Sequence, residues 1–154
     1  MITSTAGIVG IGYESRTLTE FLDGLLSDGV KRLVDVRLTP MSRKPGFSKT
    51  ALSRALSGVG IRYEHRPELG NPKPNRAGFA GDRDELDRAR EIYAEVLRHP
   101  TAVETLDGLA ARSTQERIAI LCFEADQARC HRDVVLAQVA ARSFTAAGSK
   151  HRAR

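Results

Sequence analysis

Two patterns of hydrophobic and polar residues alternate along the chain. The first is a short, continuous apolar run, found at residues 8–13, 32–37 and 117–124. Runs of this length bounded by glycine or polar residues are typical of buried strands. A more polar run at residues 61–65 predicts a further strand, nearer to an edge of the sheet.

The second pattern is a longer segment with apolar residues at helical spacing. Thr17 and Glu20 have the spacing of a capping box at the start of the first such segment, and Thr101 and Glu104 have it at the start of another. The segments that predict helices are 17–29, 48–60, 84–97, 101–110 and 130–141. Residues 67–81, rich in proline, glycine and asparagine, predict a long loop that binds a ligand or is disordered.

Strands that alternate with helices predict an α/β fold, a three-layer Rossmann-like domain with a mainly parallel sheet of about four strands. Right-handed crossovers favour the strand order 3-2-1-4. Ligands of such sheets bind beyond the carboxyl ends of the strands, so the residues that follow each strand are the ones to examine for chemistry.

The length and composition fit one domain. The chain has 154 residues, 41% of them hydrophobic and 28% charged, which predicts a single α/β domain over residues 1–142 and a basic, mobile tail over residues 143–154. No apolar run is long enough to cross a membrane, and residues 1–5 lack the start of a secretion signal. A cytoplasmic protein with two free thiols is the simplest interpretation.

The net charge of +5 is distributed unevenly along the chain. Residues 37–76 hold nine basic and two acidic residues, whereas residues 82–95 hold three basic and six acidic ones. A basic segment next to predicted strand ends suits an anionic partner, such as a phosphate-bearing small molecule or a nucleic acid. A solvated basic surface without a ligand is the alternative.

The most distinctive chemistry lies at the start of the last predicted helix, where Cys130, His131 and Arg132 are consecutive. A helix N-terminus and neighbouring cations favour a thiolate, which makes Cys130 a candidate nucleophile. The same features describe an anion pocket, with Arg132 as the binding residue. A small cysteine buried beneath a helix end remains the competing interpretation.

Other candidates follow the remaining strands. Glu124 is a candidate general acid or base, or else pairs with Arg132. Asp35 and Arg37 point to the same side of their strand and form a structural ion pair or bind the ligand. Cys122, inside an apolar run, is interpreted as a core residue. With His131, the two cysteines could supply three zinc ligands, but their seven-residue separation matches no compact zinc pattern, and no metal site is assigned. The candidate catalytic residues are thus Cys130, Glu124 and His131. The candidate substrate-binding residues are Tyr13, Asp35, Arg37, Arg43, His65 and Arg132.

Several of these segments together resemble one family. The segments that carry the resemblance are 11–15, 18–21, 34–37, Pro40 to Arg43 with Phe47, Tyr63 with 67–70, 122–124 and 130–132. The chain is similar, over roughly residues 8–140, to the domain-of-unknown-function 488 family, an uncharacterised α/β domain. The resemblance implies the fold and no particular reaction.

Three functions remain open from the sequence. The favoured one is an enzyme that acts on a phosphate-bearing ligand or nucleic acid through the Cys-His-Arg segment. A non-catalytic nucleic-acid-binding module is the alternative, and a metal-binding domain is the third. A Gly-x-Gly pair at Gly10 and Gly12 lacks the third glycine of a dinucleotide site, so no cofactor is assigned. The substrate and the oligomeric state are not predicted.

Overall fold

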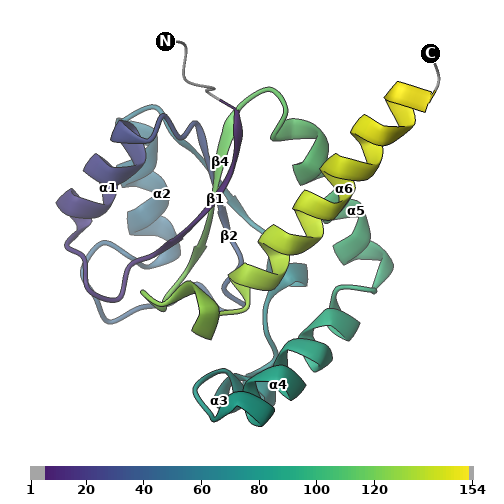
Figure 1. Cartoon of the computed structure of the whole chain (residues 1–154). Coiled ribbons are helices and arrows are strands. Elements are labelled where there is room, and N and C mark those ends of the chain that lie inside the picture. Colours follow the sequence, from purple (N-terminus) through teal and green to yellow (C-terminus); the bar gives the residue numbers. More distant parts are fainter. Residues whose placement is uncertain (1–5, 153–154) are drawn as a thin grey trace.

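Four parallel strands form the centre of the molecule: β1 (Gly7–Gly12), β2 (Arg32–Asp35), β3 (Arg62–His65) and β4 (Arg117–Cys122). The structure is a computed structural model that describes the backbone of residues 6–152 and the side chains of residues 6–142. All four strands run downward in Figure 1, so their carboxyl ends meet at the lower edge of the sheet. The predicted α/β fold with a parallel sheet is confirmed.

The order of the strands is β1-β4-β2-β3, so the predicted order 3-2-1-4 is wrong. The strand β4 lies between β1 and β2 and pairs with both. Five of its six residues are buried, whereas four of the six residues of β1 are only partly buried. The most continuously apolar strand therefore takes a central place, and the glycine-rich β1 takes an edge.

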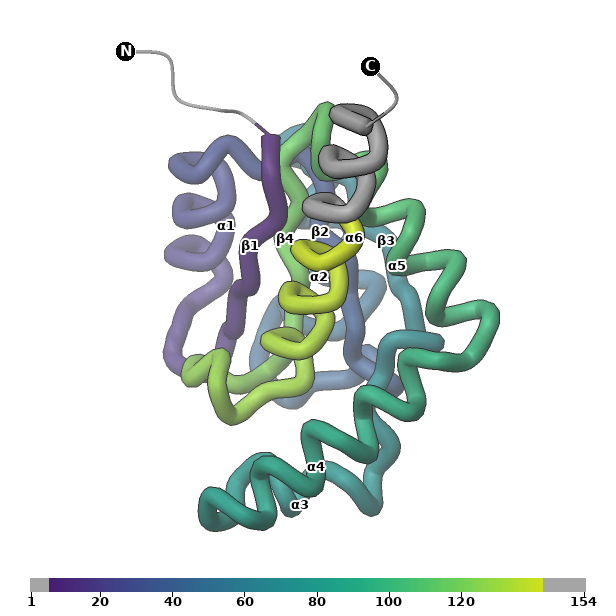
Figure 2. Tube along the Cα trace, turned by 45° about the vertical axis from the view of Figure 1, so that its right-hand side comes forward, coloured from purple at the N-terminus to yellow at the C-terminus, as the bar shows by residue number. Residues whose placement is uncertain are grey.

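Helices cover both faces of the sheet (Figure 1). The helices α1 (Leu18–Ser27) and α2 (Lys49–Gly58) pack on one face, and α5 (Pro100–Arg112) and α6 (Arg132–Arg152) cover the other. The helix α4 (Arg83–Val96) belongs to the same core as α5 and α6. Alternate residues of β1, β2 and β4 supply the two cores, as the period of a strand requires. The turned view in Figure 2 shows the same separation of the helices by the sheet.

The segment predicted as a long loop, residues 67–81, is a chain of short helices. It contains the 3₁₀ turns η1 (Pro67–Leu69) and η2 (Lys73–Asn75) and the helix α3 (Arg76–Phe79). Buried Asn75 holds it in place, because its Nδ2 donates to Asn71 Oδ1 at 3.0 Å and to the Ala89 carbonyl at 2.9 Å. The segment lies with α4 below the sheet in Figures 1 and 2.

Two helix starts were predicted from capping boxes, and one is confirmed. Thr17 and Glu20 exchange the expected side-chain to backbone hydrogen bonds at the start of α1. The capping box predicted at Thr101 and Glu104 is wrong, since α5 begins one residue earlier, at Pro100. Proline favours the first position of a helix, and Nδ1 of His99 accepts the hydrogen bond from the Thr101 amide instead.

The last helix differs from its prediction at both ends. Cys130 closes the 3₁₀ turn η3 (Gln127–Arg129), and α6 begins two residues later, at Arg132. The helix continues to Arg152, so most of the segment predicted as a tail, residues 143–154, has a helical backbone. Residues 153 and 154 lie outside the described residues. So do residues 1–5, for which the sequence predicts no secretion signal. No helix of the described chain is both long and apolar enough to span a membrane.

The end of β1 lies very close to the loop that follows β4. An ideal Cβ at Gly12 would overlap the Glu124 carbonyl oxygen, and backbone atoms, unlike the end of a flexible side chain, cannot turn away. Only glycine allows this approach.

We predict that Gly12→Ala lowers the free energy of unfolding by about 1–3 kcal/mol, because the loop must move to admit the methyl group. Gly108→Ala is the matched control: nothing lies within 4 Å of its Cβ position in α5. That variant should gain up to about 1 kcal/mol from helix propensity. Urea denaturation measures both, and equal stability of Gly12→Ala and wild type would contradict the prediction.

Candidate functional site

A cavity of about 370 Å³ lies beyond the carboxyl ends of β1, β2 and β4. Its walls come from the loops after these strands, from residues 71–79 and from the η3 turn with the start of α6. The lining residues are Tyr13, Arg37, Leu38, Thr39, Met41, Ser42, Asn71, Arg76, Phe79, Cys122, Phe123, Glu124, Arg129, Cys130 and His131. This is the edge where the α/β fold predicts a ligand.

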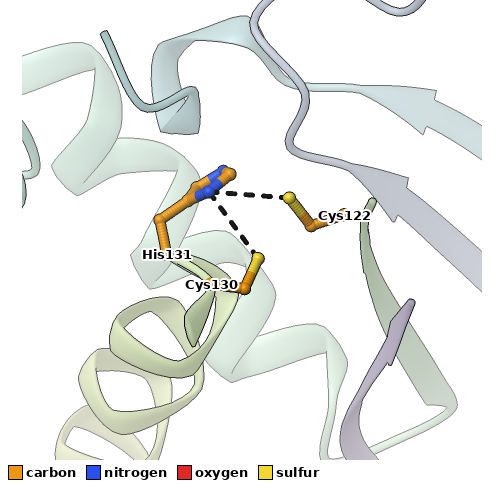
Figure 3. Close-up of side chains that lie close together, drawn as sticks. All are labelled: Cys122, Cys130 and His131. Atoms are coloured by element: carbon orange, nitrogen blue, oxygen red, sulfur yellow. Dashed lines mark hydrogen bonds between the residues drawn. The ribbon is translucent and has the colours of Figure 1, made fainter. Parts of the chain in front are cut away.

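Two thiols and an imidazole meet in the wall of the cavity. Nδ1 of His131 lies 3.6 Å from Cys122 Sγ and 3.8 Å from Cys130 Sγ. Figure 3 shows the imidazole facing both sulfur atoms, one at the end of β4 and the other just before α6. All three residues are buried. Cys122, which the sequence places in the core, is therefore both a core residue and a member of this cluster.

The other nitrogen of His131 fixes the orientation of the ring. Nε2 lies 3.0 Å from the carbonyl oxygen of Val36, the residue that directly follows β2. A carbonyl oxygen only accepts hydrogen bonds, so Nε2 carries a proton and donates it. In the neutral ring Nδ1 is consequently an acceptor, and in the imidazolium it is a second donor. Either way, Nδ1 is the atom that faces the thiols.

The two cysteines differ in acidity. Burial alone would raise the pKa of Cys130, but hydrogen bonds from Cys122 and His131 and the imidazolium charge lower it to about 6. The hydrogen bond to Cys130 raises the pKa of Cys122 well above its ordinary value, and burial raises it further. Near neutral pH, Cys130 is therefore the thiolate of the pair, and Cys122 is the thiol that donates to its neighbours.

Glu124 lies beside the thiol of the less acidic cysteine. Cys122 Sγ donates a hydrogen bond to Glu124 Oε2 at 3.1 Å. The side chain is partly exposed and lines the cavity, which leaves it accessible to a ligand or a water molecule. A carboxylate in this place can move a proton between solvent and the buried thiols.

Arg37, a predicted substrate-binding residue, uses its donors within the protein. Its Nε and Nη2 make a bidentate pair with the buried carboxylate of Asp35, at 2.9 and 2.7 Å. Its Nη1 donates to Tyr13 Oη and to the Phe47 carbonyl. Burial lowers the pKa of Arg37, but the Asp35 bonds outweigh it and the net shift is upward. Arg37 is thus a permanent cation that ties the loop after β2 to β1.

Arg132 is also committed to the protein. Its Nη1 donates to the Glu124 carbonyl at 2.5 Å and its Nη2 to the Ala125 carbonyl at 3.2 Å. The side chain is buried and does not line the cavity, and its Nε has no partner among the described residues. Arg132 thus holds the loop after β4 in place from behind the cavity wall.

The structure brings together five of the nine residues that the sequence predicts for the site. Tyr13, Arg37, Glu124, Cys130 and His131 line the cavity. Asp35 and Arg132 lie behind the wall and support it through the hydrogen bonds described above. Arg43 is exposed outside the lining, and His65 Nε2 lies 2.8 Å from the Arg37 carbonyl, also outside it.

Sequence reasoning missed Cys122, Asn71, Arg76 and Arg129 as lining residues. The position of Cys122, two residues before Glu124 at the end of the clearest strand, was the available signal. The other three come from segments predicted as loops, and loop residues have no periodicity that shows where their side chains point.

A family comparison agrees with this arrangement. The family model for the domain of unknown function DUF488 matches residues 17–139, which includes β2, β3, β4 and the whole Cys-His cluster. The chain belongs to this family. No curated protein and no solved structure matches the chain. Membership in the DUF488 family thus agrees with the α/β fold and supplies no reaction.

The same cluster has the arrangement of a metal site. The sulfur atoms of Cys122 and Cys130 and a ring nitrogen of His131 all lie within 4.8 Å of one another. Zinc bonds of about 2.3 Å to sulfur and 2.0 Å to nitrogen place such ligand atoms roughly 3.5–3.8 Å apart in a tetrahedron. The measured 3.6 and 3.8 Å agree with that spacing, and three ligands would leave the fourth position open.

The buried Asp35 carboxylate gives a test of how the cavity wall is held. We predict that Asp35→Asn lowers the free energy of unfolding by about 3 kcal/mol, because it leaves the Arg37 cation buried without a countercharge. Tyr63→Phe is the control: it removes a single hydrogen bond to Asp35 Oδ2 and should cost about 1 kcal/mol. Urea denaturation compares them, and an equal loss in both variants would contradict the role of the charge pair.

Proposed function

We propose that this domain is a thiol-dependent enzyme in which Cys130 is the nucleophile and His131 is its acid–base partner. The observation that carries the proposal is the convergence of Cys130 Sγ, Cys122 Sγ and His131 Nδ1 in a cavity wall, with the ring held by the Val36 carbonyl. An oriented imidazole beside a thiol is the arrangement that nucleophilic catalysis needs. Cys122 and Glu124 complete the site.

The reaction we propose is hydrolysis or transfer of an ester or phosphoester group. The Cys130 thiolate gives an electron pair to the electrophilic atom, and the leaving group departs with the bonding pair and takes the Nδ1 proton of His131. Water then attacks, gives a proton to Glu124 and releases Cys130 as a thiolate. Cys122 lies within hydrogen-bond distance of both Glu124 and His131, and it carries the proton from Glu124 back to His131.

We further propose that the substrate bears a phosphate and that the protein works in a reducing compartment such as the cytoplasm. The uneven positive charge of residues 37–76 favours an anionic partner, and both thiols are free, as the mechanism requires. A nucleic acid is the alternative anionic partner for this basic segment. A non-catalytic module that binds nucleic acid would need neither the acidic thiol nor the oriented imidazole.

Alkylation by iodoacetamide tests the nucleophile directly, because only the thiolate reacts. We predict that the rate at Cys130 rises through a midpoint near pH 6 and is constant above it, since the pKa is lowered to about 6. Labelling of Cys122 should stay slow across neutral pH, because its pKa is raised. Peptide mass spectrometry separates the two sites.

Two variants control the alkylation experiment. Cys130→Ser should remove the fast phase, and His131→Gln should move its midpoint upward, because the thiolate loses a hydrogen-bond donor and a cationic neighbour. Equal rates at both cysteines, or a His131→Gln midpoint unchanged from wild type, would count against the proposed thiolate.

A metal centre is the second candidate function, favoured by the two sulfur–nitrogen distances of 3.6 and 3.8 Å and by the closeness of all three ligand atoms. The Nε2 hydrogen bond to a backbone carbonyl is also the usual support for a metal-bound histidine. In that case Glu124 would act on water at the open position, and Cys130 would be a ligand rather than a nucleophile.

Elemental analysis separates the two candidates. For a thiol enzyme we predict that protein purified without chelator contains far less than stoichiometric zinc or iron. Addition of zinc should then change the melting temperature of wild type and of Cys122→Ala by the same small amount. Stoichiometric metal that is lost in Cys122→Ala and that blocks alkylation of Cys130 would establish the metal centre and overturn the nucleophile.

A further inference from the structure

Arginines of the cavity wall differ in how many of their donors the protein uses. Arg37 donates through Nε, Nη1 and Nη2 to protein acceptors, as described above. Arg129 donates only through Nη1, to the Gly81 carbonyl at 2.6 Å and to the Phe79 carbonyl at 3.5 Å. Arg76 donates only through Nε, to the Asn71 carbonyl at 3.3 Å. A guanidinium carries five N–H donors, so Arg76 and Arg129 keep most of theirs.

Neither of these two arginines has a countercharge within the protein. The ion pairs among residues 6–142 involve Arg32, Arg37, Arg66, Arg90, Arg98, Arg117 and Arg142, and none involves Arg76 or Arg129. The lining of the cavity contains one carboxylate, Glu124, which already accepts a hydrogen bond from Cys122. Two exposed cations without a countercharge therefore line the cavity that the thiols also line.

The backbone holds both arginines in place before any ligand arrives. The carbonyl that anchors Arg76 belongs to buried Asn71, which Asn75 fixes in turn. The carbonyls that anchor Arg129 belong to α3 and the residues that follow it, so this side chain connects the η3 turn to the opposite wall. Anchored guanidinium groups lose less conformational entropy on binding than free ones.

We propose that Arg76 and Arg129 form the subsite that binds the phosphate group of a small-molecule substrate. The proposal rests on the proposed function in one respect, that the subsite and the thiols share a cavity. Two guanidinium groups match the charge of a phosphate monoester, between −1.5 and −2 near neutral pH, better than that of a carboxylate. A cavity of about 370 Å³ holds a small molecule, whereas a nucleic-acid strand needs an extended groove.

The two arginines of this subsite differ from the arginines that the sequence predicts as substrate-binding residues. The donors of Arg37 are used by protein acceptors, and Arg132 and Arg43 lie outside the lining. The segment of residues 67–81, predicted as a long loop, supplies one of the two cations through α3. The proposed substrate thus lies between residues 71–79 and the η3 turn.

Calorimetric titration with inorganic phosphate and with phenyl phosphate tests the subsite. The protein is Cys130→Ser, which keeps the cavity and lacks the nucleophile, so that binding is measured without turnover. We expect both probes to bind, acetate to bind much more weakly, and Arg76→Gln or Arg129→Gln to lower the phosphate affinity at least about tenfold. The matched control is Arg83→Gln, an exposed arginine of α4 outside the lining, which should leave the affinity unchanged.

Several outcomes would overturn the subsite. These are no phosphate binding, an equal loss in Arg83→Gln and Arg76→Gln, or acetate binding as tightly as phosphate. A single-stranded oligonucleotide that binds more tightly than phenyl phosphate, with steep salt dependence and no effect of Arg76→Gln, would also overturn it and favour a nucleic-acid-binding surface. Melting temperatures identify any variant that fails to fold, and Arg76, with its single 3.3 Å bond, is the safer substitution.

The two proposals fail separately. A slow, ordinary thiol at Cys130 together with loss of phosphate binding in Arg76→Gln removes the nucleophile and supports the subsite. A fast alkylation phase that phosphate does not slow, with equal phosphate affinity in Arg76→Gln and Arg83→Gln, supports the nucleophile and removes the subsite.

Discussion

The hydrogen bond between His131 Nε2 and the Val36 carbonyl joins the last segment of the site to the central sheet. It fixes which ring nitrogen faces the sulfur atoms, and so fixes the protonation states that the cluster can adopt. The bond connects residues 95 positions apart in the chain, since Val36 directly follows β2 and His131 directly precedes α6. The acidity of Cys130, whether for catalysis or for a metal, depends on this orientation.

The position of β4 between β1 and β2 makes that bond possible. Because β4 is central, the loop after it lies between the loops after its two neighbours, and Cys122 at its end reaches the imidazole from one side. In the order predicted from the sequence, β4 would have been separated from β2 by β1. Val36 and His131 would then have been one strand further apart.

The sequence predicts the elements better than their arrangement. Continuous apolar runs identify β1, β2 and β4, because a strand inside a parallel sheet is buried, and a more polar run identifies the edge strand β3. The strand order depends instead on which edges pair, and local patterns do not encode this choice; the greater apolarity of β4 over β1 was the remaining clue. Similarly, Thr17 starts a helix by a local interaction, whereas Pro100 displaced the box at Thr101.

The same difference between local and distant information explains the site. Cys130, His131 and Glu124 can be predicted because they follow a strongly apolar strand. The sequence predicts Cys122 only as a core residue, because a buried strand position has the same pattern whether or not its side chain contacts a histidine. The role of an arginine depends on acceptors far away in the chain. Arg132, predicted to bind a ligand, instead donates to carbonyls of the loop after β4. Arg76, in a segment predicted as a loop, lines the cavity with most of its donors unused. An anion site in this fold is therefore recognised by which cations the protein leaves unpaired, and sequence position alone does not show that.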